Sequence, residues 1–352
     1  MHLSAQRFIC QSVTHNKITQ WKNHKNQDLE QIVDTIETIV TGVPAPIRKN
    51  FFKAFGQLCT AAVDIPVANL ESKAAEIRAA SKARVQIIEK EGEQISKQLN
   101  VPKEYVAKAS EKFASKVVKE QLNLDEIGVN AANNLRNDRH IESDQSSEEI
   151  GDDWLNEFEN YAKLKSSDDM KIVFGKILSG EITKPGTFSI RTVRLISQLD
   201  NQAAKLFQKL CSQSVSMYLG PSIIFDARIV SFSGNAASNS LTKYGLSFDN
   251  LNVLQEYGLI ISDYNSYMNY APCIVNEQMQ ISASLCFGET QYGLMPTDKE
   301  KYDKTVKLNG VAFTKAGKEL LKIIPYQEAP NYRKDLEDYL SKIHLKLVTI
   351  GK

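Results

Sequence analysis

The sequence lacks the patterns by which most catalytic and metal-binding sites are recognised. Its five cysteines lie far apart and form no CxxC pair, which indicates a reduced chain with buried thiols. The five histidines are dispersed and no HExxH occurs, so we expect no metal site and no cofactor. The lack of GxxxxGKS/T, GxGxxG and GxSxG motifs disfavours nucleotide hydrolysis and a serine nucleophile elbow. We therefore predict no catalytic residues.

Long apolar runs and an excess of one charge are also missing. No stretch approaches the roughly 18–20 apolar residues that cross a bilayer, and the N-terminus is too polar for a signal peptide. We therefore expect a cytoplasmic protein without a membrane span. The 43 basic and 42 acidic residues give a formal net charge of +1, which excludes a global basic field for nucleic acid but not a local patch.

What the sequence does contain is helical periodicity, and at 352 residues it is long enough for two or three domains. The longest periodic segment, Val67–Leu99, is rich in strong helix formers. Its apolar residues fall near one stripe: Leu70, Ala74, Ile77, Ile88, Ile95 and Leu99. Polar residues interrupt this stripe, so a regular heptad coiled coil is not predicted. We interpret the segment as a long, largely solvated helix, with an oligomerisation stalk as the alternative.

Other helices surround this segment. Two are predicted over Glu104–Val118 and Leu122–Leu135, and another over Ile47–Val63. The apolar face of this last helix is expected to pack on a neighbouring helix; it consists of Phe51, Phe52, Phe55, Leu58 and Cys59. Further on, a helix is predicted to begin at 166–169 and to end at Ser179-Gly180, and another is predicted over Gln202–Met217 after a cap at Asp200 or Asn201.

The sequence as a whole divides into five predicted segments: 1–63, N-terminal helices with a mobile lead-in; 64–136, the long helix and the helices packed on it; 137–151, an acidic linker; 152–219, a central helical domain; and 220–352, an α+β domain. The expected fold class is mainly α with a small α+β C-terminal part.

Within the predicted α+β domain, strand and helix patterns alternate. Strands are expected over Ser222–Val230, Met279–Phe287 and Thr305–Phe313, and a helix over Phe248–Tyr257 that ends at Gly258. The order of helix, strand, strand and helix is compatible with a winged-helix-like unit, although many α+β folds share that order.

The sharpest local chemistry lies in Glu181–Thr192, between two helical patterns. Pro185-Gly186 is a turn dipeptide, and Ser189 stands where a helix N-cap belongs. Phe188 is placed to act as a hydrophobic staple toward Val193. The stretch is predicted to be a corner between two helices, with Glu181 and Arg191 as an ion pair that fixes it.

This corner also offers a candidate binding surface. Arg191 and Arg194 lie three residues apart on one predicted helix, so both can face an anion such as a phosphate, helped by Lys184 and by the helix N-terminus. Structural pairing is the alternative that we favour for these cations. The paired carboxylates at 152–153 and 168–169 stand at helix starts, where the helix dipole accounts for them without a metal.

Several stretches resemble one family. They are Asp153–Phe158, Asp168–Glu181, the string Pro185-Gly186-Thr187-Phe188-Ser189-Ile190-Arg191-Thr192, Leu254–Ile260 and Phe313–Leu320. Together with Asp64–Arg84 they look like the bacterial domain-of-unknown-function family 2806, over most of residues 64–324. The resemblance implies no activity and no catalytic residues. It implies a bacterial accessory protein, for which a role in phage defence is conceivable.

Three functional hypotheses follow. The first is a non-enzymatic interaction protein, which self-associates or docks a protein partner through its long helix and C-terminal unit. The second is a nucleic-acid-binding accessory protein that uses the wing-like C-terminus and the surface of Lys184, Arg191 and Arg194. The third is an enzyme whose site leaves no recognisable sequence pattern.

Overall fold

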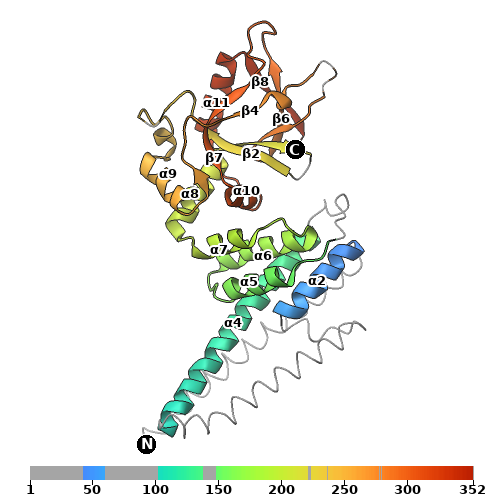
Figure 1. Cartoon of the computed structure of the whole chain (residues 1–352), viewed down its shortest axis with the longest axis vertical. Helices are drawn as coiled ribbons and strands as arrows, with labels where there is room; N and C mark the ends of the chain where they lie inside the picture. The colour runs from blue at the N-terminus through green and yellow to red at the C-terminus, as the bar shows by residue number, and fades with distance from the viewer. Residues whose placement is uncertain are drawn as a thin grey trace, which may run out of the picture. The chain divides into compact units, whose positions relative to one another are not determined.

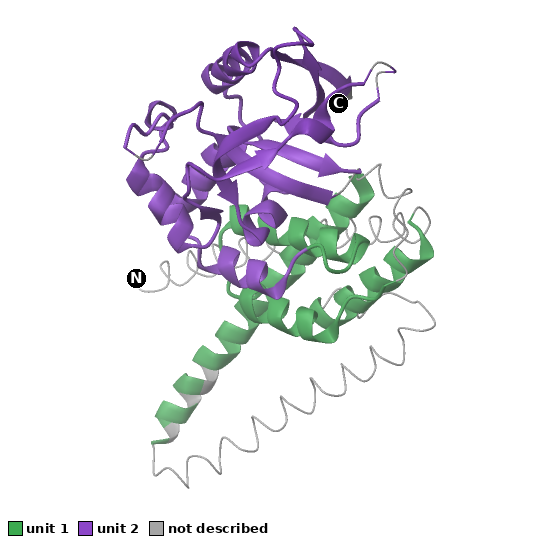
Figure 2. Ribbon diagram, turned by 45° about the horizontal axis from the view of Figure 1, so that its top comes forward, with its two compact units in different colours: residues 1–187 green, residues 188–352 purple. Residues whose placement is uncertain are grey.

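The computed structural model describes residues 43–59, 102–137, 148–220, 223–235, 237–276, 278 and 280–351 (Figure 1). The chain divides into two compact units, residues 1–187 and 188–352 (Figure 2). The division falls at Thr187/Phe188, inside the segment 152–219 that the sequence predicts as one helical domain. The predicted long helix Val67–Leu99 and the stalk built on it lie outside the described residues, as does most of the predicted linker.

The described part of the first unit is helical. Its elements are α2 (Ala45–Leu58), α4 (Lys103–Asn137), α5 (Asp152–Ala162) and α6 (Asp168–Thr183). The apolar face of α2 is buried as predicted, with the rings of Phe51 and Phe55 4.1 Å apart. Trp154 and Phe158 of α5 stack on each other at 5.0 Å between ring centroids. These side chains form a helical core that also includes Phe174 of α6.

Helix α4 corrects the prediction of two helices over Glu104–Val118 and Leu122–Leu135. It is one uninterrupted helix of 35 residues, which spans about 50 Å at 1.5 Å per residue. The residues at the predicted break, Lys119-Glu120-Gln121, are all good helix formers with no glycine or proline among them, so nothing local ends the helix.

The second half of α4 packs on its neighbours through glycines. A Cβ at Gly175 of α6 would lie 2.5 Å from Asn130 Cβ and 3.2 Å from the backbone nitrogen of Ala131 on α4. Gly128 of α4 faces Cys59 and Phe55 in the same way. The backbones therefore approach closely, and leucine, isoleucine and alanine side chains fill the seam: Leu124, Ile127, Ala131, Ala132 and Leu135.

Helix α6 continues to Thr183, so the predicted end at Ser179-Gly180 is wrong. The backbone N–H of Lys184 still donates to Gly180 O at 2.9 Å, which shows that one glycine does not break a packed helix. Pro185 sets the true end, because the residue before a proline disfavours the helical conformation.

The second unit combines helices with an eight-stranded antiparallel sheet, so the fold of the chain is mixed. Its helices are α7 (Ile190–Gln198), α8 (Asn201–Ser212), α9 (Phe248–Glu256), α10 (Lys315–Leu321) and α11 (Pro330–Lys342). Its strands are β1 (Val215–Leu219), β2 (Ile223–Val230), β3 (Ile260–Ile261), β4 (Tyr267–Asn269), β5 (Ser284–Phe287), β6 (Thr290–Pro296), β7 (Lys307–Phe313) and β8 (Leu345–Gly351). The strand order is β3-β7-β2-β1-β5-β6-β8, and β4 also pairs with β7.

Several strands differ from the sequence prediction, which also lacks the short strands β3 and β4. The predicted helix Gln202–Met217 ends at Ser212, and Val215–Leu219 pairs as β1 with both β2 and β5. Strand β6 was not predicted, since its glycine and terminal proline weaken the strand pattern. The α+β outline of the C-terminal part is confirmed, but its sheet is larger than the "small" part expected.

A cluster of aromatic side chains connects α11 to the sheet. Tyr332 of α11 is buried and lies 5.0 Å from Tyr244 and 5.1 Å from Phe232 between ring centroids. Its hydroxyl accepts a hydrogen bond from Val230 N at 2.8 Å, so the phenol ties α11 to the end of β2. Burial raises the pKa of Tyr332 well above its ordinary value, which keeps the phenol neutral.

The tight contact of α6 with α4 gives a first prediction. We expect Gly175→Ala to lower the free energy of unfolding by about 1–3 kcal/mol, because the new methyl group overlaps Asn130 and the backbone of Ala131. Urea denaturation measures the loss. Gly151→Ala is the matched control, since its Cβ would meet nothing closer than 4.0 Å. Equal, small effects of both substitutions would contradict the packing described.

Candidate functional site

The corner between α6 and α7 is held by a hydrogen bond between a side chain of α6 and the backbone of the turn. Glu181 is buried, and its carboxylate accepts a hydrogen bond from the N–H of Gly186 at 2.6 Å. Gly186 has a φ of +83°, a left-handed conformation that favours glycine. The Pro185-Gly186 turn is thus confirmed. The proposed Glu181–Arg191 ion pair stays a prediction.

Ser189 caps α7 as the sequence predicted. Its hydroxyl accepts from the N–H of Thr192 at 3.3 Å. The residue before the cap, Phe188, and the fourth residue after it, Val193, are both about 1% exposed, as expected for a hydrophobic staple. Local sequence therefore determines how this helix begins.

Nothing in the local sequence points to the residue that completes this cap. Glu319 of α10 lies at the N-terminus of α7, where its Oε2 accepts from Ser189 N at 2.8 Å, Ser189 Oγ at 3.0 Å and Thr192 Oγ1 at 2.5 Å. In a capping box a glutamate three residues after the cap binds the cap's N–H. Here Thr192 occupies that position, and a glutamate from another helix supplies the carboxylate.

The end of α9 meets the same region through α10. Thr314 caps α10 by accepting from Gly317 N at 3.1 Å, and its hydroxyl donates to Gly258 O at 2.6 Å. A side chain at Gly317 would overlap the carbonyl oxygen of Leu259. We call the set of Ser189, Thr192, Gly258, Thr314 and Glu319 the motif junction. It brings together three stretches that carried the family resemblance.

The predicted anion-binding residues fall in different settings. Arg191 and Arg194 are exposed on one face of α7 in the second unit, and Lys184 is the C-cap residue of α6 in the first. Arg191 Nη2 lies 3.5 Å from the Cβ position of Gly258, beside the C-terminus of α9, where the helix dipole favours a cation. The N-terminus of α7 already holds the Glu319 carboxylate. The N-terminus of α7 is therefore occupied by a carboxylate, and the contact of Arg191 with the end of α9 leaves Arg194 as the other exposed candidate for an anion.

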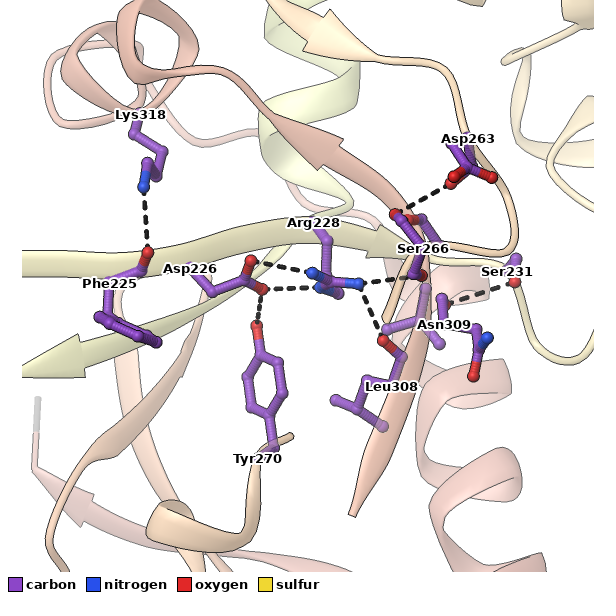
Figure 3. A network of polar contacts seen from close by, with 12 residues as sticks. Phe225, Asp226, Arg228, Ser231, Asp263, Ser266, Tyr270, Leu308, Asn309 and Lys318 are labelled. Carbon is purple, nitrogen blue, oxygen red and sulfur yellow. Dashed lines mark hydrogen bonds and ion pairs between the residues drawn. The ribbon is translucent and has the colours of Figure 1, made fainter. Parts of the chain in front are cut away.

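A second polar cluster is buried within the sheet (Figure 3). On β2, Arg228 Nε and Nη2 donate to the two carboxylate oxygens of Asp226 at 2.6 and 2.9 Å. Arg228 Nη1 donates to Leu308 O of β7 at 2.9 Å and to Ser266 O at 3.1 Å. Tyr270 donates its phenolic proton to Asp226 Oδ2 at 2.9 Å. Burial, and then the charge of Asp226, hold the pKa of Tyr270 well above its ordinary value. Because these groups satisfy one another's hydrogen-bonding capacity, we assign the cluster a structural role.

A third feature is the first half of α4, which extends away from α2, α5 and α6 (Figure 1). Every described side chain from Glu104 to Lys119 is exposed except half-buried Val106. Phe113 is 53% and Val117 46% exposed. Spacings of seven and four residues join Val106, Phe113 and Val117, which we call the α4 stripe.

A row of basic residues flanks the α4 stripe. Lys108, Lys112, Lys116 and Lys119, the lysine row, are exposed and follow one another at intervals of four, four and three residues. At about 100° per residue they lie together, on average roughly a third of a turn from the α4 stripe. The opposite flank carries Ala114 and Val118. The sequence analysis overlooked this row, although its spacing is visible in the sequence.

Other chemistry is sparse among the described residues. Cys59, Cys211 and Cys273 are buried as predicted, and burial raises the pKa of each thiol. Within the described ranges no group of three His, Cys, Asp or Glu residues is arranged for a metal ion. None of the helices in that part of the chain combines the length and apolar character of a bilayer crossing.

Comparison with known proteins gives one relationship. A family model described as "Protein of unknown function (DUF2806)" matches residues 107–337, more than half of the chain. The searches of curated proteins and of solved structures gave no match. The matched range includes the motif junction, the buried Arg228 cluster and most of the exposed half of α4.

The motif junction yields a second prediction. Glu319→Ala leaves the Ser189 N–H and the Thr192 hydroxyl without their acceptor, and we expect it to cost about 2–3 kcal/mol of unfolding free energy. Glu319→Gln keeps an acceptor oxygen but loses the charge, and should cost about half as much. Glu337→Ala, which removes a carboxylate that is 49% exposed, is the control and should change stability by less than about 0.5 kcal/mol. An unfolding midpoint for Glu319→Ala no lower than that control's would contradict the role given to Glu319.

The buried ion pair gives a third prediction. Arg228→Met leaves the Asp226 carboxylate buried without its ionic partner, which typically costs about 3–5 kcal/mol. Thermal unfolding followed by circular dichroism measures the effect. Arg333→Met removes a similar Nε–carboxylate bond to Glu337, but at an exposed site, and should be nearly neutral. Similar losses from both changes would argue against a special role for burial.

Proposed function

The chain belongs to the DUF2806 family, as its sequence motifs predicted, and we propose that it is a non-enzymatic interaction protein that self-associates through helix α4. The observation that carries the proposal is the α4 stripe, in which Phe113 and Val117 are exposed and Val106 is half-buried. Exposed apolar side chains in a row on one helix face are typical of a surface that docks another helix. This proposal transfers the predicted role of a long helix from Val67–Leu99 to α4.

Continuity of the apolar face supports the proposal. Continuing the same spacing from Val106, Phe113 and Val117 leads through Glu120 to Leu124, Ile127 and Ala131, which are at most 5% exposed. Along one helix, therefore, the same face is covered by α2 and α6 in the second half, whereas in the first half no other element among the described residues covers it. A second helix laid on the first half would extend an interface that already exists.

Nucleic-acid binding is the second candidate, and the lysine row is the observation that favours it. Four exposed lysines on one flank of a helix can neutralise phosphates without a globally basic chain. Arg194 on α7 adds a separate exposed cation. The winged-helix-like unit expected from the sequence comprised the helix that is α9, the two strands that are β5 and β7, and the helix that is α10. In the sheet β5 pairs with β1 and β6, whereas β7 pairs with β2, β3 and β4, so the two expected wing strands are not neighbours.

Self-association is tested on the full chain. We expect sedimentation velocity to detect a concentration-dependent dimer for the wild-type protein. The double substitution Phe113→Glu/Val117→Glu places two charges in the α4 stripe and should weaken dimerisation at least tenfold, about 1.4 kcal/mol or more.

Ser115→Glu is the matched control, because residue 115 lies on the side of α4 opposite the stripe. It should dimerise like the wild type. A wild-type chain that remains monomeric over the whole concentration range, or equal effects of both changes, would overturn the proposal.

A further inference from the structure

We propose that two copies of this chain pair their α4 helices in antiparallel orientation, and that the pair gathers both lysine rows on one face as a binding surface for double-stranded nucleic acid. The inference rests on the proposed self-association and adds its geometry and its ligand class. It is carried by the position of the covered half of α4, by Glu120, and by the flank on which the lysines lie.

The half of α4 that other helices of the same chain cover decides the orientation of the proposed pair. Helices α2 and α6 occupy the continuation of the stripe after Glu120. In a parallel pair the covered halves of both copies would lie side by side, and their α2 and α6 helices would push the two α4 helices apart. In an antiparallel pair the covered halves lie at opposite ends, since each α4 begins at Lys103 near the point where its partner's covered half starts. The exposed halves can then overlap.

The spacing of the stripe fixes the register. If Val106 of one copy lies opposite Val117 of the other, the two Val–Val contacts are related by the two-fold axis and Phe113 packs between them. In this register Glu120, which lies 3.7 Å from Lys116 of its own chain, also comes opposite the first turn of the partner's α4, where the helix dipole favours a carboxylate. A parallel pair would instead place the two Glu120 side chains opposite each other, which is unfavourable.

The same symmetry places the lysines. The two-fold axis of an antiparallel pair is perpendicular to both helices, so one flank of each helix falls on the same face of the pair. Both lysine rows then lie on that face and present eight lysines. A parallel pair, whose axis runs along the helices, would put the two rows on opposite faces. The pairing thus creates a concentrated basic surface that a single helix lacks, and such surfaces bind the phosphate backbone.

Disulfide cross-linking tests the orientation. Full-length Val106→Cys and Val117→Cys chains are mixed and oxidised, and each is also oxidised alone, with the wild-type chain reporting any cross-link of the native cysteines. We expect a covalent dimer mainly in the mixture, where residue 106 of one chain lies opposite residue 117 of the other. The two copies of residue 106 in an antiparallel pair are about 16 Å apart along the helix axis, which is too far for a disulfide. Cross-linking of each variant alone, but not between them, indicates a parallel pair and overturns the inference while leaving the proposed self-association intact. A chain that stays monomeric and forms no cross-link in any of the samples overturns both the inference and the proposed self-association.

Binding to a double-stranded DNA fragment tests the basic face. The cross-linked dimer should bind at low salt at least tenfold more tightly than the Phe113→Glu/Val117→Glu monomer, with an affinity that falls as salt rises. Lys112→Glu/Lys116→Glu should abolish most of this binding, whereas Val118→Glu, on the flank without lysines, should not. No binding by the cross-linked dimer, or equal binding by the monomer, would overturn the assignment of the ligand.

Discussion

The second unit depends on one buried ion pair more than on any other single interaction. Arg228 is 2% exposed, and its guanidinium reaches Asp226 on its own strand, Leu308 on β7 and Ser266 before β4. Taking these charges out of water is costly unless every hydrogen bond is made. A slip of β7 against β2 would leave the ion pair within β2 intact but would move Leu308 O away from Arg228 Nη1, so a buried guanidinium N–H would lose its acceptor and the wrong register is penalised. We infer that the cluster specifies the arrangement of the sheet: breaking the pair is costly, but replacing the whole pair by apolar side chains could be nearly neutral.

The motif junction shows which parts of a site a sequence can reveal. The Pro185-Gly186 turn and the Ser189 cap depend on neighbouring residues, and both were predictable. Glu319 binds Ser189 and Thr192 from far along the chain, and no periodicity connects them. The family resemblance had drawn attention to both stretches, but only the fold explains why they occur together: each supplies half of one helix cap.

The fold was predictable to a similar degree. Helices with an apolar face and a cap, such as α7 and α8, are predictable because both signals are local. Strand β1 lies where the sequence predicts the end of a helix, because its hydrophobic residues follow α8 without a glycine or proline between them. Short apolar segments do not distinguish helix from strand by periodicity, and pairing with β2 and β5 decides the matter. Helix α4 is the opposite case: the two helices predicted there are one, because no residue breaks it.

Helix α4 also shows why total charge is a poor guide to binding. The formal net charge of +1 excludes only a field that covers the whole molecule. The intervals of four, four and three residues bring the lysine row to one flank of a helix, while acidic residues elsewhere in the chain balance the sum. The α4 stripe lies beside that row, so in the proposed pair contact through the stripe would determine how the rows of two chains are placed. Hydrophobic pairing and electrostatic recognition would then be coupled through a single helix, and a change in the orientation of the pair would change the charge pattern without changing any residue.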